Sequence, residues 1–438
     1  MDQPLLADIK VRLALKIYPH RWTTVGKNPQ ALQVTVIMKV LIVDQFVPYP
    51  PTDGGALRIF NLLREISRQH EVSLISLFSP STGEDNGVAY LRTLCAHVEL
   101  VPRWDGSLRD YRLRQLRAIL KGEPMRYVTD YSVEMADKIR TLTEREHFDI
   151  VDIQRPCMAP YVEAIAPNNS RKFLTMYDVP YIQYRRIISV VRGWRLKRRI
   201  FFMDWLFSKQ AILKYARCFD KCVLVSELDR KTLKQAGPDL DIAVIPNGVD
   251  ASGYSLLTDQ STIPTLLFIG TLNYAPNVDG AIFFCQEIFP LIKRQTPDIK
   301  LIIVGKKPDS NVQALASADV TVVGDVPSII PYYQQAMISL VPLRSGGGTR
   351  LKILESMALG RPVVSTTLGC EGLTVTHGEN ILIADTPVDF ATQTVRLLSD
   401  AGLRQHLIVN ARRLVETTYD WQVIAQQLLQ IYDQAIHK

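Results

Sequence analysis

From residue 38 onwards, short apolar runs alternate with longer stretches whose apolar residues recur at helical spacing. The first run is Met38–Asp44, rich in β-branched residues, and the stretch 56–68 that follows has apolar residues three apart. Continuous apolar strands are typical of parallel sheets, because the connecting helices bury such sheets on both faces. Repeated alternation of this kind predicts βαβ units and an α/β protein with mostly parallel sheets.

The expected strands form two groups, which are separated by turn-rich sequence at Pro246-Asn247-Gly248 and by the largely polar segment 252–264. The strands expected are 40–43, 71–77, 150–153 and 223–225, then 266–269, 301–304, 320–323, 338–341, 362–365 and 381–383. We therefore expect two doubly wound, Rossmann-like domains facing a cleft, 38–250 and 251–415, followed by a helix in 416–438. Ligands of such sheets bind at loops beyond the carboxyl ends of the strands.

Residues 1–37 do not share this pattern and carry a net charge of +3. No continuous apolar core follows their charges, so they make a poor signal peptide. Our hypothesis is that Met38 is the true start, or that 1–37 is an extension outside the core. No run of about 18 apolar residues occurs in the chain, so we expect no membrane span.

The composition of the 438 residues, 47% apolar and 22% charged, excludes disordered and fibrous classes. Six scattered cysteines do not make a disulfide framework, which favours a reducing, cytoplasmic compartment. No group of His, Cys or Asp has metal-ligand spacing, so we expect no metal. The net charge of +7 is uneven, because residues 181–221 alone carry +9. This concentration argues against a general nucleic-acid partner.

The segment 345–355, Ser-Gly-Gly-Gly-Thr-Arg-Leu-Lys-Ile-Leu-Glu, joins a strand to a helix. Consecutive glycines let the backbone approach a ligand closely, and the N-terminus of the following helix favours a phosphate. Arg350 and Lys352 are then suited to neutralise a diphosphate, and Glu355 to hold two sugar hydroxyls. The alternative is a flexible loop before a surface helix with one Lys–Glu pair. A P-loop is excluded because Gly-Lys-Ser/Thr is absent.

This segment, with Ala358-Leu359-Gly360-Arg361-Pro362 after it, resembles the donor-binding region of retaining GT-B glycosyltransferases of family 4 (glycosyl transferases group 1). The resemblance extends over nearly all of 38–436. It includes Pro246–Asp250 as the domain junction, 268–272 as the first strand of the donor domain, and a final helix with Trp421 that crosses back to the first domain.

The resemblance implies a nucleoside diphosphate-sugar as co-substrate, no other cofactor and metal-independent transfer. Glu355 would bind the ribose, and the turn at Gly324 and Val326 would touch the base. The remaining donor contacts would come from Gly270, Gly347, Gly348 and Thr349.

Two features depart from the family pattern. Gly347 stands where a second glutamate is usual, and Asn273 and Tyr274 stand where an Arg and a Lys usually follow the Gly270 turn. We infer that Arg350 and Lys352 supply the charge for the diphosphate, and that contacts to the donor sugar are atypical.

Gly54 and Gly55 lie between the first strand and its helix, with Arg58 one turn further on. They would let backbone N–H groups and Arg58 face the diphosphate or acceptor; the alternative is an ordinary βα turn. For a direct catalytic role we select Asp178; the alternative is that this Asp only caps a turn. Asp152 and Gln154 are other residues that could face the cleft. Transfer on one face of the sugar needs no protein base, because the leaving phosphate can accept the proton.

The basic stretch 181–221 also carries interleaved aromatic residues and is expected to be helical. It fits an interfacial helix on an anionic membrane, a groove for an anionic lipid-linked acceptor, or a solvated basic face over a core.

The function expected is therefore transfer of a hexose-type sugar to a glycan or lipid-linked acceptor in exopolysaccharide, lipopolysaccharide or other envelope glycan assembly. The enzyme would be cytoplasmic, with the membrane's inner face as an alternative location. The rivals are a nucleotide-sugar epimerase on the same fold and a non-catalytic basic module that binds membranes or polyanions.

Overall fold

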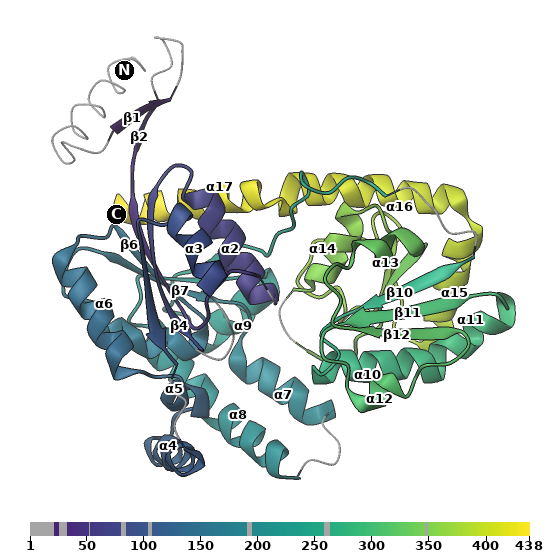
Figure 1. Cartoon of the computed structure of the whole chain (residues 1–438), viewed down its shortest axis with the longest axis horizontal. Coiled ribbons are helices and arrows are strands. Elements are labelled where there is room, and N and C mark those ends of the chain that lie inside the picture. Colours follow the sequence, from purple (N-terminus) through teal and green to yellow (C-terminus); the bar gives the residue numbers. More distant parts are fainter. Residues whose placement is uncertain are drawn as a thin grey trace.

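The computed structural model describes residues 22–25, 33–51, 53–79, 85–103, 107–190, 195–257, 263–346 and 349–438. Two parallel α/β domains lie side by side, and a long C-terminal helical segment runs along both of them (Figure 1). The two-sheet, doubly wound architecture predicted from the alternating pattern is confirmed.

The N-terminal domain contains a seven-stranded sheet of order β5-β4-β3-β6-β7-β8-β9, in which every pair is parallel. Its strands are β3 (Lys39–Asp44), β4 (Glu71–Phe78), β5 (His97–Pro102), β6 (Ile150–Gln154), β7 (Arg171–Met176), β8 (Lys221–Leu224) and β9 (Ile242–Val244). Its helices are α2 (Gly54–Ile66), α3 (Asp85–Leu94), α4 (Leu108–Lys121), α5 (Met125–Thr129), α6 (Val133–Arg145), the 3-10 helix Pro156–Ala164, α7 (Pro180–Val190), α8 (Arg195–Ala216) and α9 (Glu227–Ala236).

The C-terminal domain contains a six-stranded parallel sheet of order β12-β11-β10-β13-β14-β15. Its strands are β10 (Thr265–Ile269), β11 (Lys300–Gly305), β12 (Val320–Gly324), β13 (Ile338–Val341), β14 (Val363–Ser365) and β15 (Leu382–Ile383). Its helices are α10 (Ala275–Phe283), α11 (Phe289–Gln295), α12 (Ser310–Gln313), α13 (Ile330–Gln335), α14 (Leu351–Ala358), α15 (Pro387–Ser399) and α16 (Ala401–Leu414), with π-helical turns at Phe284–Ile288 and Val415–Tyr419.

The last helix, α17 (Trp421–Ile436), packs on the N-terminal domain although it follows the C-terminal one. Trp421 is 1% exposed, and a Cβ on Gly248 would lie 2.8 Å from its indole, so the glycine of the junction makes room for this ring. The Tyr432 hydroxyl donates to Asp152 on β6 at 2.6 Å. The helix is therefore part of the first domain's core and holds the two domains together.

A separate antiparallel pair, β1 (Trp22–Val25) and β2 (Gln33–Val36), precedes this core and belongs to neither large sheet. Figure 1 shows the pair projecting away from the N-terminal domain. The basic stretch 181–221 does not form a single helix. It contains most of α7 and the whole of α8, and its last residue, Lys221, begins β8.

Candidate active site

The two domains meet around the glycine-rich loop between β13 and α14. Gly54, at the start of α2, lies so close to α14 that a Cβ on it would be 2.9 Å from Leu351 Cδ1. The Asn247 side-chain amide donates to Thr349 Oγ1 at 2.6 Å. Gly347 and Gly348, which were expected to contact the donor, lie outside the described residues. The segment from Thr349 to Leu351 therefore lies against the N-terminal domain.

Lys352 lies in the first turn of α14 and points back over β10. Its Nζ donates to Asn277 Oδ1 at 3.0 Å and lies 5.1 Å from the centre of the Phe268 ring. Gly270 adjoins the same ammonium, since a Cβ there would be 3.0 Å from Nζ. Burial and then the neighbouring Arg350 lower the pKa of Lys352 to about 7. A buried cation of this kind gains strongly from an anionic ligand.

Arg350 precedes α14 and is also partly buried. Burial lowers its pKa, while Tyr274, Glu371 and Asp178 oppose that change through their charges. These three residues come from the loop after β10, the loop after β14 and the end of β7. The guanidinium therefore lies where the strand ends of both sheets meet.

Glu355 lies one turn further along α14 than Lys352. Burial raises the pKa of its carboxyl, and Lys352 lowers it in part. Burial, and then the charge of Glu355, raise the pKa of Tyr254 and Tyr333, so both phenols lie nearby. In the described part of the chain no hydrogen bond to the carboxylate is found, which leaves its oxygens available to a ligand.

The turn with Gly324 and Val326 follows β12 at the same edge of the sheet. The Asp325 backbone N–H donates to Gly305 O at 3.1 Å, and its carboxylate accepts from the Lys307 N–H at 3.0 Å. Gly324 is exposed and Val326 partly buried. The turn is thus a rigid, accessible rim beside the Gly270 turn.

The glycine loop of the N-terminal domain differs from expectation. The N–H groups of Gly55 and Ala56 donate to Asp53 Oδ1 at 2.8 and 3.0 Å, so an Asp cap already occupies the helix end. Arg58 is 1% exposed and donates to the carbonyls of Ile245 and Pro246. Its charge is used to hold the domain junction, which corrects the expectation that it faces the diphosphate.

Arg155, which the sequence did not single out, occupies the place expected for Arg58. Its Nε donates to the buried Asp44 at 2.9 Å, and its guanidinium stacks near Phe46 and Tyr177. A Cβ on Gly55 would be 2.7 Å from its Nη2. The residue has a left-handed φ of 75°, an unusual conformation for a side chain of this size. Gln-Arg-Pro after a strand was the only available signal.

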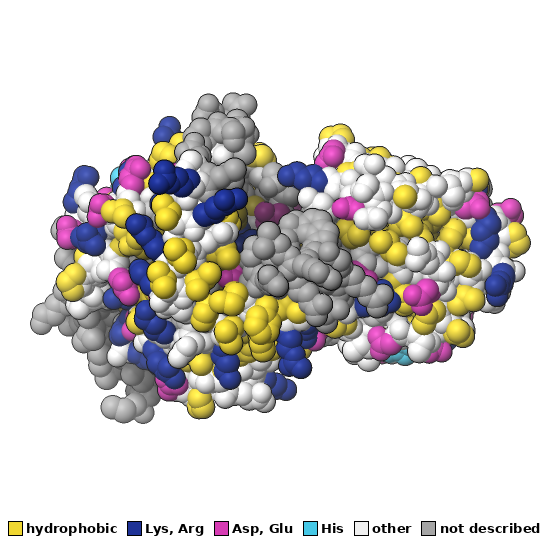
Figure 2. Space-filling view, turned by 90° about the horizontal axis from the view of Figure 1, so that it is seen from below, with side chains coloured by type: hydrophobic (Ala, Val, Ile, Leu, Met, Phe, Trp, Pro, Cys, Tyr) yellow, Lys and Arg dark blue, Asp and Glu magenta, His cyan; other side chains and the backbone are white. Residues whose placement is uncertain are grey.

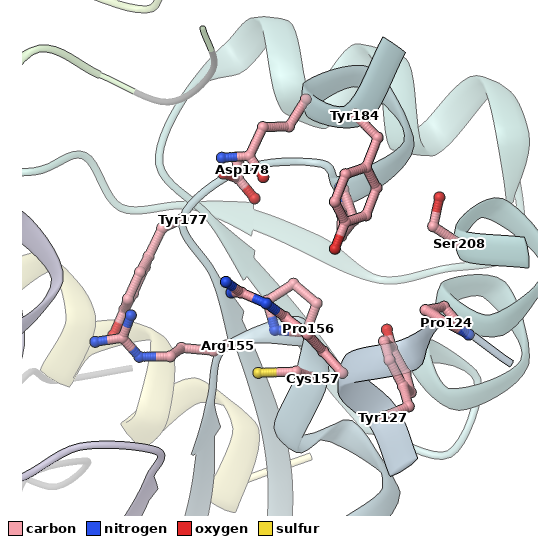
Figure 3. A pocket seen from close by; sticks show the side chains of 12 residues that line it. Pro124, Tyr127, Arg155, Pro156, Cys157, Tyr177, Asp178, Tyr184 and Ser208 are labelled. Atoms are coloured by element: carbon pink, nitrogen blue, oxygen red, sulfur yellow. The ribbon is translucent and has the colours of Figure 1, made fainter. Parts of the chain in front are cut away.

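Asp178 follows β7 and lines a cavity of about 190 Å³ together with Arg155, Tyr177 and Tyr184 (Figure 3). Figure 3 shows the Asp178 carboxylate and the Tyr184 phenol on one side of this space. Burial, and then the charge of Asp229, raise the pKa of Asp178 to about 6. The carboxylate is therefore charged at neutral pH and can accept a proton.

Asp152 and Gln154, the other two polar residues considered near this edge, already have hydrogen-bond partners within the protein. Asp152 is 1% exposed and accepts hydrogen bonds from Thr175 and Tyr432. Gln154 accepts from the Tyr177 hydroxyl at 3.1 Å. Asp152 therefore joins β6, β7 and α17 inside the domain and does not face the cleft, contrary to the alternative considered from sequence.

An ion pair between the domains was also missed from sequence. Arg186 of α7 binds both carboxylate oxygens of Glu371 and donates to Gly346 O at 2.9 Å. Both partners belong to loops at the carboxyl edge of the second sheet. Because Arg186 and Glu371 are 185 residues apart, no local pattern pairs them.

No group of three or more His, Cys, Asp or Glu in the described residues has the geometry to hold a metal ion. None of the helices found in these residues has the length and apolar character needed to cross a membrane.

Comparison with known families accounts for this arrangement. Residues 52–252 match the family described as Glycosyltransferase Family 4, and residues 263–400 match the one described as Glycosyl transferases group 1. The chain belongs to the family 4 glycosyltransferases. The two matches include both domains and the whole of α14.

Relatives of this glycosyltransferase include an uncharacterized 44.6 kDa protein in the cps region of Klebsiella pneumoniae. It is 25% identical over 398 residues, which are 87% of this chain and 96% of the relative. A phosphatidyl-myo-inositol mannosyltransferase of Mycobacterium tuberculosis is 25% identical over 226 residues, 48% of this chain and 58% of that enzyme.

Solved structures show that this glycosyltransferase has the GT-B fold. Anabaena HepE in complex with UDP and glucose superimposes with a TM-score of 0.64 and 16% identity, over 91% of this chain and 100% of HepE. TarM gives a TM-score of 0.66 and 11% identity, over 91% and 99% of the two chains.

Proposed function

We propose that this protein transfers a hexose-type sugar, with retention of anomeric configuration, from a nucleoside diphosphate-sugar to an acceptor hydroxyl. The observation that carries the proposal is the placement of Arg350, Lys352 and Glu355 at one edge of the second sheet, facing the first domain. Two cations and an accessible carboxylate match a diphosphate next to a ribose.

Lys352 and Arg350 would stabilise the negative charge that develops on the departing diphosphate. Such charges act strongly where water is excluded, and both side chains are already held in place by β10 and its loop. Lys352 lies against Gly270, where the family usually has other cations. This position supports the inference that Lys352 replaces them.

Glu355 would accept two hydroxyls of the ribose, and the turn at Gly324 and Val326 would contact the base. The acceptor would approach from the N-terminal domain, with its hydroxyl near Asp178. If transfer occurs on one face of the sugar, the leaving phosphate takes the proton and Asp178 orients the acceptor.

The acceptor we infer is lipid-linked and belongs to envelope glycan assembly. A similar protein comes from a cps region, and another similar protein is named for phosphatidyl-myo-inositol. An enzyme acting on such acceptors would work at the inner face of the cytoplasmic membrane.

The test is a thermal-shift panel of UDP- and GDP-sugars on the wild type and on Glu355→Ala. One donor should raise the melting temperature of the wild type, and its affinity should fall about 10- to 100-fold in the variant, because a charge-assisted pair of bonds is lost. Arg396→Gln, an exposed change on α15, is the matched control.

Product analysis then separates the rivals. Conversion of the donor without acceptor would indicate an epimerase, and tight polyanion binding without any response to nucleotide sugars would indicate a non-catalytic module. Wild-type activity and donor affinity in Glu355→Ala would refute the proposed role of this residue.

A further inference from the structure

Helix α4 exposes apolar side chains that no other part of the described chain covers. Leu113, Leu116 and Leu120 are 48%, 53% and 78% exposed. They recur three and four residues apart, as on one face of a helix. A folded monomer rarely leaves such a stripe in water unless something binds it.

The stripe points away from the protein. At about 100° per residue, the three leucines lie within an arc of about 60°. Ala118, which is 1% exposed, lies on the opposite side of α4. Arg114 lies on that side too, and it donates to the carbonyls of Val128 and Tyr131. The helix is therefore attached by its polar back, and its apolar face is free.

Helix α8, which lies next to the C-terminal end of α4, also exposes apolar side chains. Its Phe202 and Leu206 are 48% and 53% exposed. The chain just after α4 is fixed to α8, because the Met125 N–H donates to Asp204 at 2.7 Å. Gly122, the C-cap of α4, also lies against Phe207. We call Leu113, Leu116, Leu120, Phe202 and Leu206 together the α4–α8 surface.

Exposed apolar side chains gather on these two helices, and cations lie around them. Of the large apolar side chains that are more than a third exposed in the described residues, nearly half lie on α4 and α8. Figure 2 shows such side chains beside Lys and Arg on the face of the N-terminal domain seen from below. The exposed cations of the two helices include Arg109, Arg112, Arg117, Lys121 and Lys209. On α4 only Asp110 opposes them, and Ser107 donates to its carboxylate.

We propose that the α4–α8 surface docks on an anionic phospholipid membrane. A short helix with a leucine stripe and basic flanks lies in the membrane interface, where the acyl boundary takes the leucines and anionic headgroups take the cations. A protein partner would need a complementary acidic and apolar groove, whereas an anionic leaflet supplies both features over any area.

The cavity of Figure 3 is lined both by residues next to the docking helices and by a residue of the cleft. Pro124, two residues after the C-cap of α4, and Ser208 of α8 line it, and so does Asp178 at the cleft. In the proposed function, this cavity would hold the headgroup of a membrane-held acceptor while its chain stays in the bilayer. This role of the cavity rests on the proposed function, whereas the docking itself does not.

The test is co-sedimentation of the full chain with vesicles of phosphatidylglycerol and phosphatidylcholine, against phosphatidylcholine alone. The wild type should bind the anionic vesicles only, and binding should weaken with salt. The triple variant L113S/L116S/L120S should lose at least about tenfold in affinity, because each leucine leaves an apolar environment. R112Q/R117Q should lose roughly fivefold for each cation removed.

The matched control is Val388→Ser on α15, a 63% exposed apolar residue of the other domain, which should bind vesicles like the wild type. All variants change exposed side chains, so their melting temperatures and donor-induced shifts should stay unchanged. Undiminished vesicle binding in the triple variant would overturn the proposal.

Two other results would also overturn it. One is a wild type that does not bind anionic vesicles even at low salt. The other is self-association of the wild type, with a monomeric triple variant and no vesicle binding by either protein. That result would show that the surface binds a second copy of the chain. If a nucleotide sugar still raises the melting temperature in either case, the proposed function stands and only the docking proposal fails. Vesicle binding without any such rise would contradict the proposed function and leave the docking proposal standing.

Discussion

The two halves of the active site are built in different ways. On the proposed donor side, Arg350, Lys352 and Glu355 lie within six consecutive residues at the start of one helix. On the acceptor side, Arg155 and Asp178 come from two different strand ends, and Arg186 from a helix. In the proposed function, the donor side would bind a diphosphate and a ribose, which present the same groups in every donor. The acceptor side is assembled from separate loops, each of which can change without disturbing the helix that holds the donor.

This difference leads to separable effects on donor binding and on transfer. Changes on α14 should act on donor affinity, and changes at the strand ends of the first domain should act on transfer. The contacts between Arg186 and Glu371 and between Asn247 and Thr349 join the two halves, so they should influence both weakly.

The largest effect is expected from Lys352→Gln. Loss of a charge-assisted bond to the diphosphate should lower donor affinity by about 100-fold. The same change removes a buried charge, so the melting temperature of the unliganded protein should rise. Isothermal titration and thermal melting measure the two quantities. An unchanged donor affinity would remove Lys352 from the donor site.

Asp178→Asn should separate the halves most clearly. Donor affinity should match the wild type, while transfer to acceptor falls about 10- to 100-fold, because a charged partner of the acceptor hydroxyl is lost. In the wild type, the carboxylate is protonated below its pKa of about 6, so transfer should fall as the pH drops through 6. Asp137→Asn, on the exposed side of α6, is the control. Equal losses of donor affinity and transfer would contradict a purely acceptor-side role.

The pH dependence of donor binding gives a smaller effect. The Lys352 pKa of about 7 means that only half of the molecules carry this charge at pH 7. In the proposed function the donor binds the charged form, so its affinity should approach its maximum near pH 6 and decline about fivefold between pH 7 and pH 8. A nucleotide sugar is esterified at both ends of its diphosphate, so the ligand itself does not titrate there. Lys352→Arg, which keeps its charge, should abolish this decline.

The smallest effect is expected from the ion pair that joins the halves. Arg186→Gln should raise the KM for donor two- to threefold with little change in kcat, because the partly exposed pair with Glu371 orients the loop and is screened by solvent. Steady-state kinetics of Arg186→Gln, Glu371→Gln and the double variant form a cycle. Additive losses in the double variant would show that the two side chains do not act as a pair.

Much of the fold was predictable because it depends on local patterns. Buried parallel strands such as Val40–Val43 and Leu301–Val304 are continuous apolar runs, and the three C-terminal helices show clear periodicity. β5 was missed because its burial alternates at the edge of the sheet. α4 was missed because its leucines face solvent, so they add nothing to a core that the sequence would reveal.

The site was predictable only where its residues are neighbours in sequence. The cluster on α14 follows from helix geometry, which places residues three apart on adjoining faces. Arg58 was assigned to the cleft because it follows two glycines, but its helix turns it toward the carbonyls after β9. Arg155 was overlooked because its importance comes from Asp44, Phe46 and Gly55, all about a hundred residues away.

The sequence by itself determined the alternation of strands and helices, the two domains and the charged end of α14. Each of these depends on residues within one or two turns of each other. Only the tertiary structure decided which cations face the cleft, that α17 completes the first domain, and that α4 presents leucines to the outside. Those outcomes depend on contacts between segments that are distant in sequence. The identity of an arginine or a leucine does not by itself show whether the side chain faces a core, a ligand or a membrane.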